Sequence, residues 1–255
     1  MFKTGLVSIS FRSLPPSEIV ALTKKCGLSY IEWGSDVHAP CDAPDALANI
    51  SALQLAHGLQ ISSYGTYFKI GLAKPEELPP YIHAAKKLGT NILRIWVGQK
   101  NYELYTAAEL KSLFDDAAVC AKMAEDAGVI LCAECHPNTV TNCLEGAEAL
   151  LAHTHSPAFQ MYWQPNQFRS VESNCAYARA VAPYVKIIHV FQWKERNRFP
   201  LSEGLREWET YLSYFDDSQT LLLEFMPDNN PDSMPAEAES LHTLVKSLSR
   251  KEENE

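Results

Sequence analysis

Four polar residues, each lying directly after its own largely apolar run, constrain the fold of this chain more than any other feature. These residues are Glu134, Gln164, His189 and Glu224. The runs before them are 128–133, 159–163, 184–188 and 220–223. The four positions are separated by 30, 25 and 35 residues (134 to 164, 164 to 189, 189 to 224). One strand–helix unit has about this length when about 250 residues are divided among eight units. The spacing therefore predicts a barrel whose later strands carry polar side chains at their carboxyl ends.

Apolar runs of strand length alternate with helical patterns along the whole chain. The expected strands are 5–9, 28–33, 59–64, 91–97, 129–134, 159–163, 184–190 and 220–225. The expected helices are 16–26, 44–57, 75–88, 106–127, 143–152, 171–182, 205–213 and 233–248. Such alternation indicates a parallel sheet. An open doubly wound sheet would normally have a glycine-rich phosphate loop after its first strand, and residues 8–13 contain no glycine. We therefore predict a single (β/α)8 TIM barrel over residues 1–250, followed by a short acidic tail at 251–255.

Charge and cysteine usage narrow the class of protein. The formal net charge of −9 disfavours binding to a nucleic-acid backbone. The apolar runs fall far short of the roughly 20 residues that span a bilayer, and the first residues lack the apolar segment of an export signal. The seven cysteines lie mostly inside apolar stretches, which is typical of reduced thiols. We expect a cytoplasmic protein with neither nucleic-acid nor membrane partners, and homo-oligomer formation stays open.

The four polar residues also predict a metal site. The carboxyl ends of barrel strands converge at one mouth, where a charged side chain must face solvent, a ligand or an ion. A single glutamate there could merely cap a helix, and a single histidine could be a core residue. Two carboxylates, an imidazole and a side-chain amide together match the ligands of one divalent cation. Glu134, Gln164, His189 and Glu224 are thus predicted to bind one Mn, Mg, Co or Zn ion.

Short motifs support this prediction through their order along the chain. They are Phe11-Arg12, Tyr30-Ile31-Glu32-Trp33-Gly34, Ala133-Glu134-Cys135-His136, Ile188-His189-Val190, the segment 200–204 with Trp208, and Leu223-Glu224-Phe225. Together they resemble the xylose-isomerase-like TIM barrels, a superfamily of sugar isomerases, ketose 3-epimerases, inosose dehydratases and metal-dependent apurinic endonucleases. The resemblance covers nearly the whole chain, although each motif is short.

The resemblance implies a mechanism. In the epimerases the matching glutamates hold the metal and flank the substrate carbon, so Glu134 and Glu224 are expected to be catalytic as well as ligating. One removes a proton beside a carbonyl and the other returns it, while the cation stabilises the enediolate. Arg198 matches a family arginine that holds substrate oxygens, although a solvated loop charge fits equally well. His136 is expected either to bind a substrate hydroxyl or to support a ligand.

The segment after the sixth strand departs from the family pattern. Members usually carry Asp-x-x-His there, whereas this chain has Gln164 in place of the aspartate and Gln167 in place of the substrate-facing histidine. An amide oxygen can still bind a hard cation but contributes no charge. We therefore expect weaker metal binding than in a three-carboxylate site. Gln167 remains a candidate for substrate binding, but it cannot shuttle protons.

Aromatic residues also lie near the predicted strand ends, where most of them could simply pack in the core or at the rim. They are Trp33, Tyr64, Tyr67, Trp96, Trp163 and Trp193. Aromatic walls with a few polar groups are typical of small-molecule pockets, and sugars can stack their C–H faces on such rings. Trp96 is therefore added to His136, Gln167 and Arg198 as a predicted substrate-binding residue.

These observations predict a metal-dependent sugar isomerase or epimerase that acts on a small sugar or polyol through an enediolate. Dehydration of a keto-polyol uses a similar intermediate and is the nearest alternative. A sugar-binding barrel without catalysis is a further alternative, because two family positions are occupied by glutamine. The endonuclease branch is disfavoured by the acidic charge and by the absence of Asp-x-x-His after the sixth strand.

Overall fold

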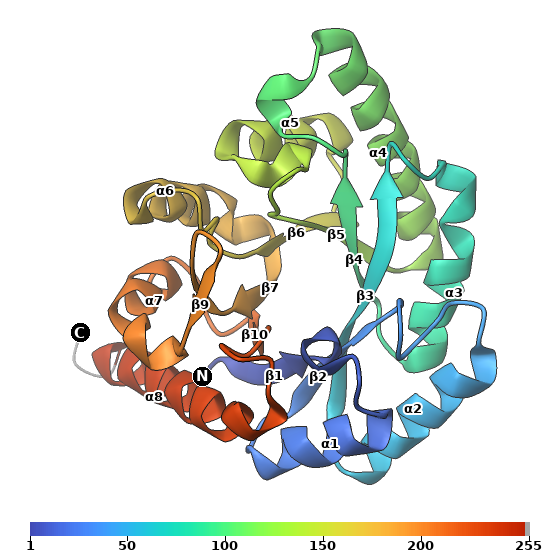
Figure 1. Ribbon diagram of the computed structural model, residues 1–255. Helices are drawn as coiled ribbons and strands as arrows, with labels where there is room; N and C mark the ends of the chain where they lie inside the picture. Colours follow the sequence, from blue (N-terminus) through green and yellow to red (C-terminus); the bar gives the residue numbers. More distant parts are fainter. Residues whose placement is uncertain (253–255) are drawn as a thin grey trace.

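A closed barrel of parallel strands forms the centre of the computed structural model, which describes residues 1–252 (Figure 1). The strands neighbour one another in the order β1-β10-β7-β6-β5-β4-β3-β2, which closes on itself. The barrel strands are β1 (Lys3–Val7), β2 (Tyr30–Gly34), β3 (Gln60–Ile70), β4 (Ile92–Val97), β5 (Ile130–Glu134), β6 (Phe159–Trp163), β7 (Val185–Val190) and β10 (Thr220–Leu223).

Each barrel strand is followed along the chain by an α-helix, and the helices surround the strands (Figure 1). The helices are α1 (Pro16–Lys25), α2 (Pro44–Ala56), α3 (Pro79–Leu88), α4 (Ala107–Ala127), α5 (Leu144–Thr154), α6 (Val171–Val181), α7 (Leu205–Leu212) and α8 (Met234–Glu252). The structure thus confirms the prediction of a single (β/α)8 TIM barrel.

Local signals explain why the helices begin and end where they do. Thr106 caps α4, because its side chain accepts a hydrogen bond from the Glu109 N–H while Glu109 bonds back to the Thr106 N–H. Gly89 and Gly128 end α3 and α4 in the left-handed region, with φ of 96° and 68°. Glycine adopts this conformation without a Cβ penalty and lets the chain turn into the next strand.

Replacing Thr106 with Ala is expected to lower the free energy of unfolding by about 1 kcal/mol, because the α4 cap is lost. Thr210→Ala is a matched control, since Thr210 is exposed within α7 and its hydroxyl donates to the carbonyl of Arg206 in the same helix. The control should be neutral or slightly stabilising. Urea denaturation of both variants measures the difference. Equal midpoints for the two would contradict the capping assignment.

Four features differ from the prediction by more than two residues or in kind. The expected helix 75–88 is divided into a short 3-10 turn at Pro75–Glu77 and α3, because Pro79 and Pro80 lack the N–H groups that would continue the first turn. Strand β3 extends beyond 64 to Ile70. After β7 the chain forms an antiparallel hairpin of β8 (Gln192–Lys194) and β9 (Asn197–Phe199), where only a long connection was expected. Finally, α8 includes residues 251 and 252 of the predicted tail, and 253–255 lie outside the described residues.

None of the helices within residues 1–252 combines the length and the apolar character that crossing a membrane requires.

Candidate metal centre and active site

The structure brings the four predicted metal ligands to one place at the carboxyl ends of their strands. Glu134 is the last residue of β5, and Gln164 directly follows β6. His189 lies within β7 opposite Leu222 of β10, and Glu224 directly follows β10. Their exposed fractions are 1% for Glu134, 6% for Gln164, 0% for His189 and 5% for Glu224. Four buried polar side chains in contact are costly unless they bind one another or a ligand.

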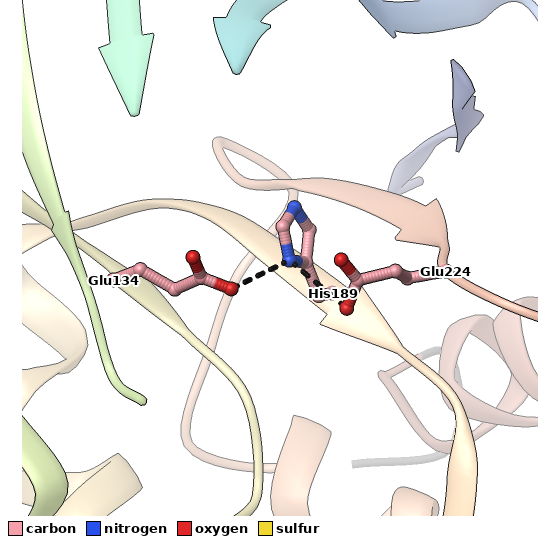
Figure 2. A group of neighbouring side chains, drawn as sticks. All are labelled: Glu134, His189 and Glu224. Carbon is pink, nitrogen blue, oxygen red and sulfur yellow. Dashed lines mark ion pairs between the residues drawn. The ribbon is translucent and has the colours of Figure 1, made fainter. Parts of the chain in front are cut away.

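The Nδ1 atom of His189 is the centre of this cluster. It lies 3.4 Å from Glu134 Oε1, 3.4 Å from Glu224 Oε2 and 3.3 Å from Gln164 Oε1. Figure 2 shows the two carboxylates reaching the imidazole from opposite sides. The ligand atoms of Glu134, His189 and Glu224 all lie within 4.8 Å of one another.

These separations fit a shared cation. Ligands about 2.1 Å from a metal ion are about 3.0 Å apart at right angles and about 3.4 Å apart at tetrahedral angles. The three distances from Nδ1 fall in that range. The donor set of carboxylate, imidazole and amide also suits divalent Mn, Co or Zn. The residues are therefore compatible with the predicted ion.

Sequence reasoning missed two further charged residues of the same cluster, Glu32 and Arg94. Arg94 of β4 is 2% exposed, and its Nε lies 3.1 Å from Glu32 Oε1 while its Nη1 donates to Glu134 Oε2 at 2.5 Å. Glu32 of β2 is fully buried, accepts a hydrogen bond from Ser63 at 3.0 Å and lies 3.5 Å from His189 Nε2. A charged residue flanked by apolar residues inside a strand was the available signal, in 92–97 and in 30–34.

Mutual attraction keeps these groups charged although they are buried. Burial alone would lower the pKa of His189, but Glu224 and Glu32, together with the contact to Glu134, raise it well above its usual value. Burial opposes ionisation of Glu134 and Glu32, yet the charge of Arg94 and the contacts with His189 hold the pKa of both carboxyls below the usual range. A cation at Nδ1 would therefore have to replace a proton.

A cavity of about 230 Å³ opens beside the cluster. Its wall includes Arg94, Glu134, Gln164 and Glu224 together with side chains from several loops at the barrel mouth. Pockets for drug-sized ligands occupy about 300–1,000 Å³, so this one suits a smaller molecule. A larger groove of about 540 Å³ lies between α5 and α6, but its lining contains a single carboxylate, Glu148, and a single imidazole, His155. The smaller cavity is therefore the one where charged and metal-ligating side chains lie together.

Three of the four predicted substrate-binding residues line this cavity, namely His136, Gln167 and Trp96. Trp96 also has a polar role that the sequence did not predict, because its indole N–H donates to Glu134 Oε2 at 2.5 Å, and its ring remains for the expected contact with a substrate. Arg198 is not among the lining residues. Its guanidinium packs over the rings of Trp193 and Phe225 and donates to Asn229 Oδ1.

The predicted aromatic cluster divides into two groups. Tyr67, Trp96 and Trp193 line the cavity. Trp33, Tyr64 and Trp163 are fully buried elsewhere in the core, which is the packing role that the sequence had left open for them. Trp163 packs against Trp208, Tyr211 and Phe215 because side chains alternate along a strand, and this position faces the helices.

Replacing Trp96 with Phe is expected to weaken Mn²⁺ binding by about 10-fold, because a ligand loses one of the donors that orient it. Trp193→Phe removes an indole from the same cavity without touching Glu134 and should leave the affinity unchanged. Calorimetric titration with Mn²⁺ measures both variants. The proposed orientation of Glu134 is refuted when the two variants lose affinity equally.

The barrel and its polar mouth define a class: parallel eight-stranded barrels with a cluster of ligating side chains at the carboxyl ends of the strands. Residues 20–244 match the family described as xylose isomerase-like TIM barrel. The chain belongs to this family, as its motifs predicted. No curated protein matches the sequence.

Solved structures show the same fold at low sequence identity. The probable 3-DHS dehydratase AsbF of Bacillus anthracis aligns with a TM-score of 0.81 and 18% identity, over 95% of this chain and 99% of AsbF. An IOLI protein with a bound zinc atom aligns with a TM-score of 0.77 and 16% identity, over 97% of this chain and 99% of that protein. An L-ribulose 3-epimerase aligns with a TM-score of 0.76 and 15% identity, over 99% and 97%.

Proposed function

We propose that this protein is a metal-dependent enzyme that moves a proton at a carbon next to the carbonyl group of a small sugar or polyol. One observation carries the proposal. The side-chain oxygens of Glu134, Gln164 and Glu224 surround Nδ1 of His189 at the edge of a small cavity. Isomerases and epimerases remain the first candidates. The names of the structural neighbours, an epimerase and a dehydratase among them, are consistent with this chemistry.

Glu134, Gln164, His189 and Glu224 would hold the divalent cation. When bound there, the cation would polarise the substrate's oxygens and stabilise the negative charge of an enediolate. Burial of the ligands would strengthen that effect, because charges interact more strongly where water is excluded.

The two glutamates have unequal freedom to exchange a proton. Glu224 lines the cavity, and among residues 1–252 the one side-chain ion pair of its carboxylate is with His189, with no side-chain hydrogen bond to restrain it further. We therefore assign Glu224 as the base that removes the substrate proton. Glu134 would return or relay a proton in an epimerase, but its Oε2 is already bonded to Arg94 and Trp96.

This restraint on Glu134 favours dehydration as a second candidate. Epimerisation needs an acid–base group on each face of the substrate carbon, whereas removal of water beside a carbonyl can use one base and a cation. His136 lines the same cavity and could donate a proton to the leaving hydroxyl.

The cavity walls supply the remaining contacts. Tyr67, Trp96 and Trp193 offer ring faces to the C–H groups of a sugar, while His136 and Gln167 offer polar atoms to its hydroxyls. A small sugar or polyol is the partner that this lining fits. Cytoplasmic location and self-association stay predictions from the sequence.

Proton exchange in D₂O tests the proposal directly. The protein is mixed with Mn²⁺ or Co²⁺ and with a panel of ketoses and keto-polyols, and NMR follows each carbon-bound proton. Exchange with a new sugar as product supports an isomerase or epimerase. An unsaturated product supports a dehydratase. Ligand binding without exchange at any carbon would instead support the non-catalytic alternative.

A further inference from the structure

Arg94 occupies an unusual position for a positive charge, inside the barrel between two carboxylates from different strands. Its Nε faces Glu32 Oε1 of β2 at 3.1 Å, and its Nη1 faces Glu134 Oε2 of β5 at 2.5 Å. The Arg94 side chain is 2% exposed, and those of the two glutamates are 0% and 2% exposed. The guanidinium therefore bridges two buried anions with little access to water.

The charges of the cluster leave room for one divalent ion. Glu32, Glu134 and Glu224 contribute three negative charges, and Arg94 balances one of them. One divalent cation balances the other two when His189 binds it as a neutral imidazole. Because uncompensated buried charge is costly, the cluster is complete with Arg94 and a single ion.

The groups around Arg94 are themselves suited to a cation. Glu32 offers Oε1, Glu134 offers Oε2, and Ser63 adds a hydroxyl that contacts Glu32 at 3.0 Å. Hard divalent cations bind such oxygen atoms. Arg94 thus lies where these oxygens would otherwise be open to a second ion.

The adjoining strand makes space for this arrangement. A Cβ atom on Gly65 of β3 would lie 2.4 Å from Glu32 Oε1 and 3.1 Å from Arg94 Nη2. The first distance is shorter than any normal contact, so a side chain here would displace the ion pair. Glycine at this position keeps the Glu32–Arg94 pair in place.

We propose that Arg94 acts as a built-in second cation, which restricts the centre to one divalent ion and leaves Glu134 to offer that ion Oε1 alone. The inference rests on the proposed metal centre and makes Arg94 the residue that sets the number of bound ions. Arg94 is a positioning residue in this scheme, because it acts through Glu134 and Glu32.

Counting bound Mn²⁺ per chain tests this inference in four proteins. The wild type and Arg94→Lys both keep the internal positive charge and should bind one ion. Arg94→Met removes that charge and frees Glu32 Oε1 and Glu134 Oε2, so it should bind two ions. One ionised water bound to the ions would balance the single excess positive charge that two divalent ions leave on three carboxylates. The double variant Arg94→Met/Glu32→Gln removes one charge of each sign and should return to one ion.

Elemental analysis after dialysis gives the stoichiometry. Electron paramagnetic resonance distinguishes one isolated Mn²⁺ from two neighbouring ions, which broaden each other's signals. An Arg94→Met protein that binds a single Mn²⁺ with wild-type affinity would overturn the inference. Should Arg94→Met fail to fold even with Mn²⁺, the double variant decides: one bound ion supports the inference, and two ions or no folding contradict it. A wild type that binds no metal would instead refute the proposed metal centre itself.

Discussion

Replacing Glu224 with Gln is expected to slow exchange of the substrate's carbon-bound proton by about 10²–10⁴-fold, the usual contribution of a general base. The amide keeps the size of the side chain and an oxygen for the cation, but it cannot accept a proton from carbon. Metal content should therefore remain close to one ion per chain while exchange is lost. Exchange rates from NMR in D₂O, measured alongside metal analysis of the same samples, separate the two effects.

A matched control is available at the same end of the barrel. Glu195 is exposed in the β8–β9 turn, and Glu195→Gln should exchange the proton at the wild-type rate. Full activity in Glu224→Gln would remove Glu224 from the mechanism.

Comparison with Glu134→Gln then distinguishes the candidate reactions. An epimerase requires both carboxylates, so the two variants should be similarly impaired in forming the epimer. In a one-base dehydration, Glu134→Gln should affect metal affinity more than the proton-removal step.

Removal of divalent cations is expected to lower the melting temperature by about 5–10 °C. At a free metal concentration 100 times the dissociation constant, binding stabilises the folded state by about 2.7 kcal/mol. For a chain of this size each kcal/mol corresponds to about 2–4 °C. Thermal unfolding with Mn²⁺ and with a chelator, followed by circular dichroism, measures the shift.

His189→Ala should abolish this metal-dependent shift, because Nδ1 of His189 is the atom that Glu134, Gln164 and Glu224 surround. His83 is exposed on α3, and His83→Ala is the control that should retain the shift. A Mn²⁺-dependent stabilisation of His189→Ala as large as that of the wild type would place the ion elsewhere.

The sequence was sufficient for the elements of the barrel because their signals are local. Apolar runs separated by helical patterns located every barrel strand to within a few residues, except for the far end of β3. The four predicted ligands also converged, since parallel strands all direct their carboxyl ends to one mouth. The change of Asp-x-x-His to Gln164 and Gln167 could be read directly from the chain.

Side-chain direction was harder to predict, because it depends on register between neighbouring strands. The pairing of β2 with β3 shifts between Ile31 and Glu32, and this shift places Glu32 opposite Ser63. Glu32 consequently reaches the cluster of predicted metal ligands, while Trp33 donates its indole N–H to Gln54 of α2. An alternating pattern cannot reveal an irregularity of this kind.

The sequence by itself determined the barrel, its order of strands and helices, and the donors at the carboxyl ends of β5, β6, β7 and β10. Only the tertiary structure decided that Arg94 and Glu32 join those donors, that Trp96 bonds to Glu134, and that Arg198 packs on aromatic rings at the rim. The physical reason is that strand formation depends on neighbours in the chain, whereas pairing of buried charges depends on strands that meet across the barrel interior. β2, β4 and β5 are far apart in sequence, and their charges come into contact only when the barrel closes.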